Sequence, residues 1–231
     1  MEQLSDITRI IALTMGVGWA AGINLYATIA VLGILGATGN MSLPPDLQIL
    51  AEPLIIGVAG VLYVVEFFAD KTPGVDSGWD TLHTFIRIPA GALLAAGAVG
   101  EVSPVISLAA ALVGGSLAAG SHGLKAGVRL LVNTSPEPFS NWAASISEDA
   151  MVIGGVWLAV MYPSIFLGLL ILFILVMIWL LPKVWRGIRT MVLRIRRFFT
   201  GDRTSTMPDT GSEPLALDDG RSPENRRQVG P

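Results

Sequence analysis

Seven ionisable side chains lie in one short stretch between two long apolar runs, EFFADKTPGVDSGWDTLHTFIR from residue 66 to residue 87. They are Glu66, Asp70, Lys71, Asp76, Asp80, His83 and Arg87. A charge at bilayer depth costs roughly 2.5 to 3.5 kcal/mol on insertion scales. So many ionisable groups beside apolar spans therefore need charged partners or a functional role.

The spacing of these residues predicts two polar helix faces. Glu66 and Asp70 are four residues apart, so they share a face at the end of an apolar helix. The Pro-Gly pair at 73–74 breaks that helix, and Asp76 can cap the next one. Steps of four, three and four then place one stripe on this second helix: Asp76, Asp80, His83 and Arg87. We expect the short helix near residues 76–88 to be re-entrant or interfacial.

The opposite charge recurs on a later apolar segment. His122, Lys125 and Arg129 are spaced three and four residues apart, so one face of that predicted span is cationic. Asn24 stands in the middle of the first apolar run, at the depth where transporters hold their ligands. We expect the acidic stretch and the cationic face to meet inside the helix bundle, toward its cytoplasmic side, and to form one polar pocket.

Three kinds of chemistry fit these residue types. In the first, the cationic face only neutralises the acidic stretch and so orders the helices. In the second, these groups and Asn24 line a cavity or gate for a small ion or an anionic solute. In the third, a divalent cation held by Asp70, Asp76, Asp80 and His83 neutralises a lipid phosphate. The spacing does not match the double-aspartate motif of lipid-phosphate alcohol transferases, and no nucleophile with an adjacent base is evident, so no catalytic residue is predicted.

The composition is that of a membrane protein. Of the 231 residues, 52% are hydrophobic and only 14% are charged, and the mean hydropathy is +0.62. A soluble domain usually carries about 25% charged residues, so lipid is the expected solvent. Because the chain has no cysteine, disulfides and thiolate chemistry are excluded. No nucleic-acid partner is expected.

Six apolar segments are candidates for membrane spans, each of which needs about 20 residues. They run from about Ile10 to Ala37, Leu54 to Ala69, Ile88 to Val99, Val105 to Val132, Ala150 to Met161 and Ser164 to Leu181. The strongly basic segment that begins at Lys183 should be cytoplasmic, and six spans then place the N-terminus inside as well. The loops around Asp46, Glu101 and Tyr162 would lie outside, and they carry no Lys or Arg.

Two segments indicate an internal duplication. Trp19 to Gly33 reads WAAGINLYATIAVLG, and Leu117 to Asn133 reads LAAGSHGLKAGVRLLVN. Both place a polar residue two positions after Ala-Ala-Gly, and similar breaks follow, NMSLPP and NTSPEP. A repeat of three spans forces the second copy to be inverted in the membrane. We therefore predict two inverted three-helix halves, about residues 10–100 and 104–182, with the site at their interface.

The chain changes in character after the membrane domain, which we place at residues 1–182. Seven of the 15 Lys and Arg lie between Lys183 and Arg203. In residues 183–200 the basic side chains alternate with apolar ones, which predicts a cytoplasmic amphipathic helix on anionic lipid. Residues 201–231 are polar and proline-rich, so we expect a disordered tail.

Several motifs resemble a known family. AGINLYATIAVLGILG from Ala21, LPPDLQILAEP from Leu43, VLYVVEFFADKTPGVDSGWDTLHTFIRIPAGALLAA from Val61 and SPEPFSNW from Ser135 together resemble the bacterial membrane family called domain of unknown function 4126. The resemblance covers roughly residues 10 to 182 and implies a multi-span protein of the inner membrane, without a particular activity. Asn141 is among its most distinctive matches, and we add it to the candidate binding residues although the resemblance attaches no role to it.

Together these observations predict an all-helical protein of the bacterial inner membrane with both termini in the cytoplasm. The expected function is transport or conduction of a small ion or an anionic solute. The alternatives are a metal-assisted enzyme or carrier acting on a lipid phosphate, and a non-catalytic envelope scaffold. Expected partners are the bilayer, anionic lipids at 183–200 and further copies of the chain. The candidate binding residues are Asn24, Glu66, Asp70, Asp76, Asp80, His83, Arg87, His122, Lys125, Arg129 and Asn141.

Overall fold

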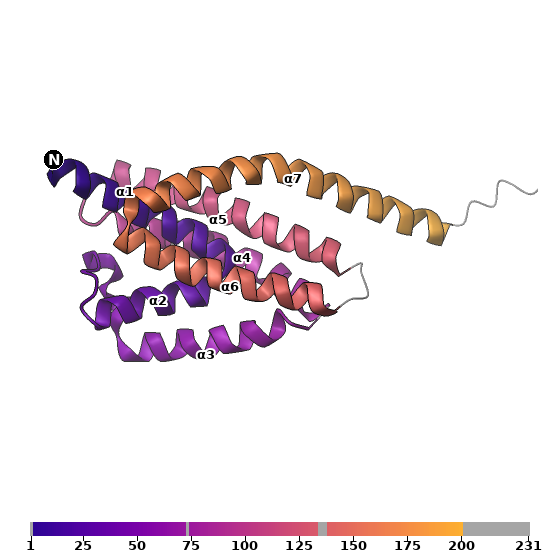
Figure 1. Cartoon of the computed structure of the whole chain (residues 1–231), viewed down its shortest axis with the longest axis horizontal. Helices are drawn as coiled ribbons and strands as arrows, with labels where there is room; N and C mark the ends of the chain where they lie inside the picture. Colours follow the sequence, from indigo (N-terminus) through magenta and orange to yellow (C-terminus); the bar gives the residue numbers. More distant parts are fainter. Residues whose placement is uncertain (1, 73, 134–137, 201–231) are drawn as a thin grey trace, which may run out of the picture. The chain divides into compact units, whose positions relative to one another are not determined.

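The computed structural model describes residues 2–72, 74–133 and 138–200, and all regular structure in this part of the chain is helical (Figure 1). The helices are α1 (Glu2–Ile23), α2 (Leu25–Ala37), the 3-10 helix η1 (Pro45–Ala51), α3 (Pro53–Ala69), α4 (Val75–Ala98), α5 (Pro104–Val132), α6 (Pro138–Met161) and α7 (Pro163–Thr200). One compact unit ends at Val192, and the last turns of α7 belong to a second unit.

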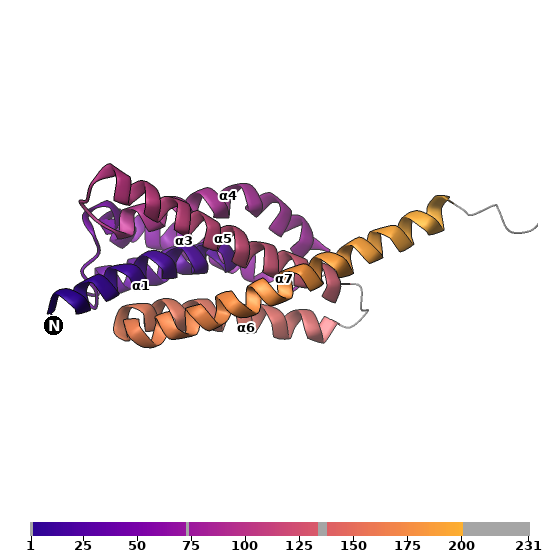
Figure 2. The ribbon, with the colours of Figure 1, turned by 90° about the horizontal axis from the view of Figure 1, so that it is seen from above.

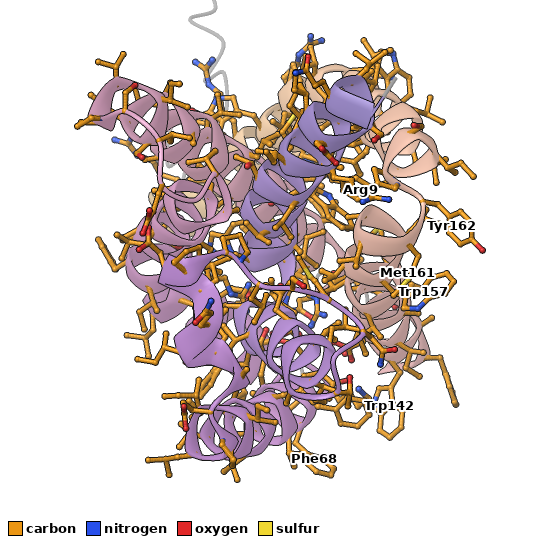
Figure 3. All side chains as sticks on the ribbon, turned by 90° about the vertical axis from the view of Figure 1, so that its left-hand side faces the viewer. Arg9, Phe68, Trp142, Trp157, Met161 and Tyr162 are labelled. Atoms are coloured by element: carbon orange, nitrogen blue, oxygen red, sulfur yellow. The ribbon has the colours of Figure 1, made fainter. Side chains whose placement is uncertain are left out.

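The bundle has apolar outer faces and charges inside, as lipid requires. Among the described residues, four helices are long and apolar enough to cross a membrane, or five if the bent pair Pro45–Ala51 and Pro53–Ala69 forms one span. Leu54 and Phe85 are 76% and 79% exposed on outward faces. Trp157 and Tyr162 also lie on the outside, as seen from the end where α1 begins (Figure 3). The prediction of six spans is not confirmed.

The first apolar run is a helical hairpin. At Asn24 the backbone leaves the helical region, with φ −147° and ψ 99°, and α1 ends. α2 then returns toward the end where α1 begins (Figures 1 and 2). Arg9 of α1 and Ser42, which follows α2, line the same hollow at that end. The prediction of one uninterrupted span from Ile10 to Ala37 is therefore wrong, because Asn24 lets the chain turn back inside the bundle.

The helices from α3 to α7 run in alternating directions along the bundle (Figures 1 and 2). α4 is a single helix, so the short helix predicted near 76–88 and the span predicted from Ile88 are one element. Pro89 lies inside α4 and removes one intrahelical hydrogen bond. The helix nevertheless continues, and it buries one stripe that consists of Asp76, Asp80, His83, Arg87, Gly91, Leu94 and Ala98.

Small residues let α1 and α5 approach closely. A Cβ at Gly18 would lie 2.6 Å from Cα of Gly114, and one at Gly22 would lie 2.1 Å from Oγ of Ser121. The residue numbers of the two pairs rise together, so α1 and α5 run parallel. Backbone contact of this kind is typical of membrane helices with small residues at their interface.

The two segments of the predicted duplication differ in structure. Asn24 divides Trp19 to Gly33 into two helices that turn back on each other. Leu117 to Asn133 lies in one uninterrupted helix, α5, up to its C-cap at Asn133. The inverted repeat is therefore not confirmed.

The two ends of the membrane domain lie at opposite ends of the bundle. Arg9 shares a hollow with Met161, which closes α6 immediately before α7 begins. At the other end, Val184 of α7 packs against Gly127 near the end of α5. α7 continues through Pro182, so the helix boundary predicted there is absent. The predicted tail, residues 201–231, lies outside the described residues.

Candidate functional site, a buried charge network

The acidic stretch and the cationic face of α5 meet in the interior. The Nζ of Lys125 lies 2.8 Å from Oδ2 of Asp70, at the end of α3. The same nitrogen lies 3.5 Å from Oε1 of Glu66 on α3 and 3.7 Å from Oδ1 of Asp80 on α4. With Oε2 of Glu148 on α6 at 3.6 Å, one ammonium group is therefore shared by four carboxyl groups.

Arg87 links the network to a histidine. It pairs with Glu66, and its Nη1 donates to Oδ1 of Asp80 at 3.2 Å. Nη1 also lies 3.2 Å from Nδ1 of His122. Because an arginine only donates, a hydrogen bond at this distance requires Nδ1 of His122 as its acceptor. Nε2 of His122 lies 2.8 Å from Oγ1 of Thr84, whose own hydrogen goes to the carbonyl oxygen of Asp80.

Arg129 joins α5 to α3 and α6. Its Nη1 donates to the carbonyl oxygen of Asp70 at 2.7 Å. Its Nη2 lies 2.5 Å from Oε2 of Glu148 on α6. One turn further, Nδ2 of Asn133 donates to both carboxyl oxygens of Asp76 at 2.8 Å. The cationic face of α5 thus contacts acids from three other helical segments.

The network holds more acids than bases. The buried carboxyl groups are Glu66, Asp70, Asp76, Asp80 and Asp149, and the buried cations are Lys71, Arg87, Lys125 and Arg129. With Glu148, whose side chain is 14% exposed, six carboxyl groups face four cations among the described residues, a surplus of two acids. Oε2 of Glu66 and Oδ2 of Asp80 are buried without a hydrogen-bond partner in the protein. Such orphaned oxygens are costly in a low-dielectric interior unless a proton or a cation reaches them.

The tip of the α1–α2 hairpin lies in this network. Oδ1 of Asn24 accepts a hydrogen bond from the backbone N–H of Ala27 at 2.9 Å and so caps α2. Nδ2 of Asn24 donates to Oδ1 of Asp149 at 3.0 Å. The carbonyl oxygen of Ile23, at the negative end of α1, accepts from Nζ of Lys125 at 3.0 Å. Both broken helix ends are therefore satisfied by network side chains.

The predicted divalent-cation ligands, Asp70, Asp76, Asp80 and His83, face different protein partners. Nε2 of His83 lies 3.1 Å from the hydroxyl of Tyr26, and its ring stacks on Trp79 with centroids 4.6 Å apart. In the part of the chain that is described, no three His, Asp or Glu side chains are placed to hold a metal ion. The geometry gives this prediction no support.

Lys71 sits at the edge of the network, in the turn after α3. Its Nζ donates to Oγ of Ser145 at 3.2 Å and lies 3.0 Å from the ring centroid of Phe67. Burial lowers the pKa of Lys71 from its ordinary value, while the charges of Asp149 and Asp70 oppose that shift. Lys71 thus ties the turn to α6 at the same end of the bundle as Asp70.

A small hollow reaches the network from the side. Its volume is about 150 Å³, and it opens between α5 and α6 behind Phe173 of α7. Ile23, Ser121, Lys125 and Glu148 line its inner wall. A small solute could therefore meet the network at the hairpin tip.

Two acidic residues of the network are missing from the sequence-based prediction. Glu148 and Asp149 lie on α6, and both contact predicted binding residues. The sequence could have indicated them, because two adjacent acids stand beside an apolar run and acidic side chains at bilayer depth are energetically unfavourable. The side chain of Asn141, the remaining predicted residue, lies outside the described part of the structure.

The comparisons with known proteins identify the family. The family described as "Domain of unknown function (DUF4126)" matches residues 11–183, so the chain belongs to it. No curated protein and no solved structure matches the chain significantly.

Proposed function

We propose that this member of the DUF4126 family transports or conducts a small cation, protons included, through the charge network at the tip of the α1–α2 hairpin. The excess of carboxyl groups carries the proposal, since among the described residues five buried acids and the partly exposed Glu148 face four buried cations. Carboxyl groups that outnumber the cations inside a low-dielectric bundle favour uptake of protons or cations and disfavour an anion. Of the two predicted solute classes, a small ion therefore fits better than an anionic solute.

The broken helix supports the same function. Discontinuous helices that end near the middle of the bilayer expose backbone dipoles, and transporters use these ends to bind ions. Here the break at Asn24 brings the Ile23 carbonyl oxygen to Lys125. Irregular backbone at this depth is tolerated where protein or a water-filled cavity surrounds it.

The distribution of basic residues favours one orientation. The turn with Lys71 and the segment of α7 from Lys183 lie at one end of the bundle. At the other end, the loops around Asp46 and Glu101 carry no Lys or Arg. We place the basic end in the cytoplasm of a bacterial inner membrane, where Arg186 and Arg189 would meet anionic lipid. α1 then begins outside, because the hairpin enters and leaves on the same side.

Reconstituted vesicles test the proposal. A pH-sensitive dye inside the vesicles and sodium and potassium assays report flux along imposed gradients. Glu66→Gln removes one buried acid, and we expect flux to fall by about tenfold or more. Glu101→Gln makes the same change in an exposed loop and should leave flux unchanged. Absence of proton, sodium and potassium flux with the unmodified protein would contradict the proposal and favour the scaffold alternative.

The lipid-phosphate alternative has less support. A phosphate would meet a network that already carries more acids than bases. The described residues also lack a cluster that could hold a metal to neutralise it. Metal analysis of the purified protein checks this alternative, and a tightly bound divalent ion that is lost on Asp76→Asn would favour it.

A further inference from the structure

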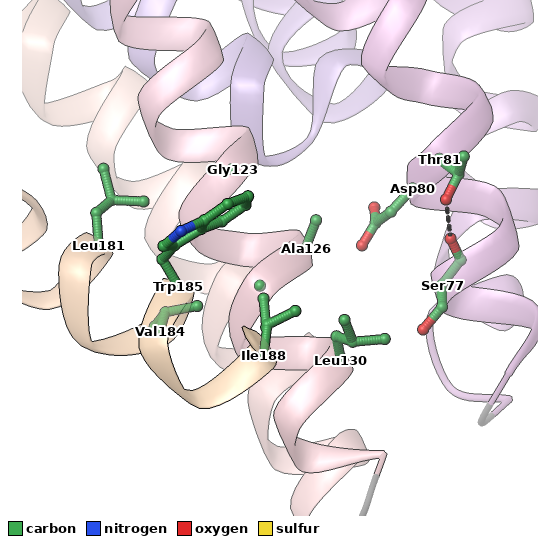
Figure 4. Close-up of a pocket in the computed structure, with 11 residues that line it drawn as sticks. Ser77, Asp80, Thr81, Gly123, Ala126, Leu130, Leu181, Val184, Trp185 and Ile188 are labelled. Carbon is green, nitrogen blue, oxygen red and sulfur yellow. Dashed lines mark hydrogen bonds between the residues drawn. The ribbon is translucent and has the colours of Figure 1, made fainter. Parts of the chain in front are cut away.

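A second hollow lies between α4, α5 and α7, apart from the hairpin tip (Figure 4). Its volume is about 370 Å³. One wall is polar and comes from α4, with Ser77, Asp80 and Thr81. The facing walls are apolar and include Leu130 of α5 and Leu181, Trp185 and Ile188 of α7. The hollow is thus amphipathic, and it lies at the basic end of the bundle.

The polar wall offers hydrogen-bond acceptors. The contacts of Asp80 with Arg87 and Lys125 use Oδ1, which leaves Oδ2 buried without a hydrogen-bond partner. The carboxyl group extends from α4 toward Ala126 on α5 (Figure 4). Thr81 donates its hydroxyl hydrogen to the carbonyl oxygen of Ser77, so its Oγ1 can only accept further hydrogen bonds. A ligand head that supplies donors therefore fits Asp80 and Thr81.

The same wall rejects an anionic head. No Lys or Arg is among the described residues that line the hollow. The two cations that pair with Asp80, Arg87 and Lys125, are already shared with other carboxyl groups of the network. A carboxylate or phosphate would face Asp80 without a counter-charge, whereas a cation would offset the surplus of acids.

The opposite walls accommodate an apolar chain. Trp185 extends from α7 into the hollow, close to Gly123 on α5 (Figure 4). A Cβ at Gly123 would meet nothing within 4 Å, so this glycine leaves open space. An indole ring also attracts a cation placed over its face.

We propose that this hollow binds an amphiphile with a primary ammonium head and an apolar chain. The ammonium group has three donors for Oδ2 of Asp80 and the neighbouring hydroxyl oxygens. Its chain lies against Leu130, Leu181 and Ile188. A free long-chain amine carries this chemistry alone, and an aminophospholipid carries the same ammonium group with a phosphate that would have to lie away from Asp80. The hollow shares Asp80 with the charge network, but amine binding is measured without ion flux, so the proposal can fail or hold independently of ion transport.

Titration calorimetry of the full chain in a neutral detergent tests the proposal. The probes are dodecylammonium and dodecyl phosphate, which share a chain and differ in the charge of the head. Gly123→Phe fills the hollow and should weaken dodecylammonium binding by about tenfold or more. Gly168→Phe adds the same ring at a glycine that also faces open space but lies outside the hollow, and should bind like the unmodified protein. Equal binding by both variants, or equally tight binding of dodecyl phosphate, would overturn the proposal.

Native mass spectrometry of protein extracted from membranes distinguishes the two possible ligands, an aminophospholipid and a free long-chain amine. A retained aminophospholipid that Gly123→Phe loses and Gly168→Phe keeps identifies a lipid ligand. Amine binding without such a lipid identifies a free amine. A lipid without an amino group that is lost only in Gly123→Phe overturns the proposal. Asp80→Asn gives a second check, since it should weaken amine binding while Leu130, Leu181 and Ile188 remain in place.

Discussion

At the scale of residues, Arg87, Lys125 and Arg129 each pair with more than one acid. Lys125 contacts four carboxyl groups, and Asp70 is the closest, at 2.8 Å from Nζ. Removing one member of such a set leaves the others desolvated and uncompensated, which costs more than the pair contributes. In a coupled network, removing one member therefore costs more than the pair contributes, whereas independent pairs would show no such excess.

The coupling of Lys125 and Asp70 can be measured in a double-mutant cycle. Lys125→Met should lower the free energy of unfolding in detergent by about 3–5 kcal/mol. Asp70→Asn should cost much less in that background than alone, with a coupling energy on the order of 1–3 kcal/mol. Lys183→Met is the control, because Lys183 is exposed and stacks on Trp179, and it should cost less than about 1 kcal/mol. Additive effects of the two buried substitutions would show that these charges are not paired.

Asn24 allows a pH-dependent test of the hairpin tip. Asn24→Asp keeps an oxygen to cap Ala27 but places a second carboxyl group within hydrogen-bond distance of Asp149. Two carboxyl groups at this distance share a proton, so the folded variant binds more protons than the unfolded one. Its thermal midpoint, compared with that of the unmodified protein, should therefore fall as the pH rises from about 5 to about 8.

The matched control for this prediction is Asn24→Ala. It removes the same amide without adding an acid, so it loses the cap and the hydrogen bond to Asp149, and its midpoint should depend on pH less than that of Asn24→Asp. If the two variants showed the same pH dependence, the new carboxyl group would not lie beside Asp149.

At the scale of elements, helical periodicity predicts well which side chains share one face of a helix, but it predicts poorly where the helix begins and ends. The spacing of Asp76, Asp80 and Arg87 on α4 predicts one stripe, and all three side chains are buried. The break at Asn24 is not predictable in this way, because a single polar residue in an apolar run fits an intact span equally well. The error at Pro89 is the opposite one. A new span is predicted to begin beside this proline, whereas α4 continues through it.

The contact of α1 with α5 depends on glycine. Gly18→Ala would place Cβ 2.6 Å from the Cα of Gly114, so one helix must move. We expect a loss of about 1–3 kcal/mol in the free energy of unfolding, as for other overpacked interiors. Gly168→Ala on α7 meets nothing within 4 Å and should be neutral or slightly stabilising. Equal unfolding midpoints for the two variants would show that α1 and α5 do not pack through these glycines.

At the scale of the whole molecule, the hairpin changes the topology with little effect on the loops. The sequence-based orientation counts the first apolar run as one crossing, and it places both termini in the cytoplasm. In the topology that we propose, the hairpin makes no crossing, so the orientation of every later loop stays the same and only the N-terminus changes sides. The basic residues alone could not reveal this, because Arg9 is the only Lys or Arg before Lys71.

Cysteine labelling in intact cells distinguishes the two topologies. The chain has no native cysteine, so single substitutions report their own positions. Gln3→Cys should react with a membrane-impermeant maleimide added outside, as should Ser103→Cys in the loop between α4 and α5. Thr72→Cys and Thr190→Cys are exposed at the basic end and should react only after the membrane is permeabilised. Six crossings would instead make Gln3→Cys behave like Thr72→Cys, and that result would remove the re-entrant hairpin and with it the broken helix end proposed to bind the cation.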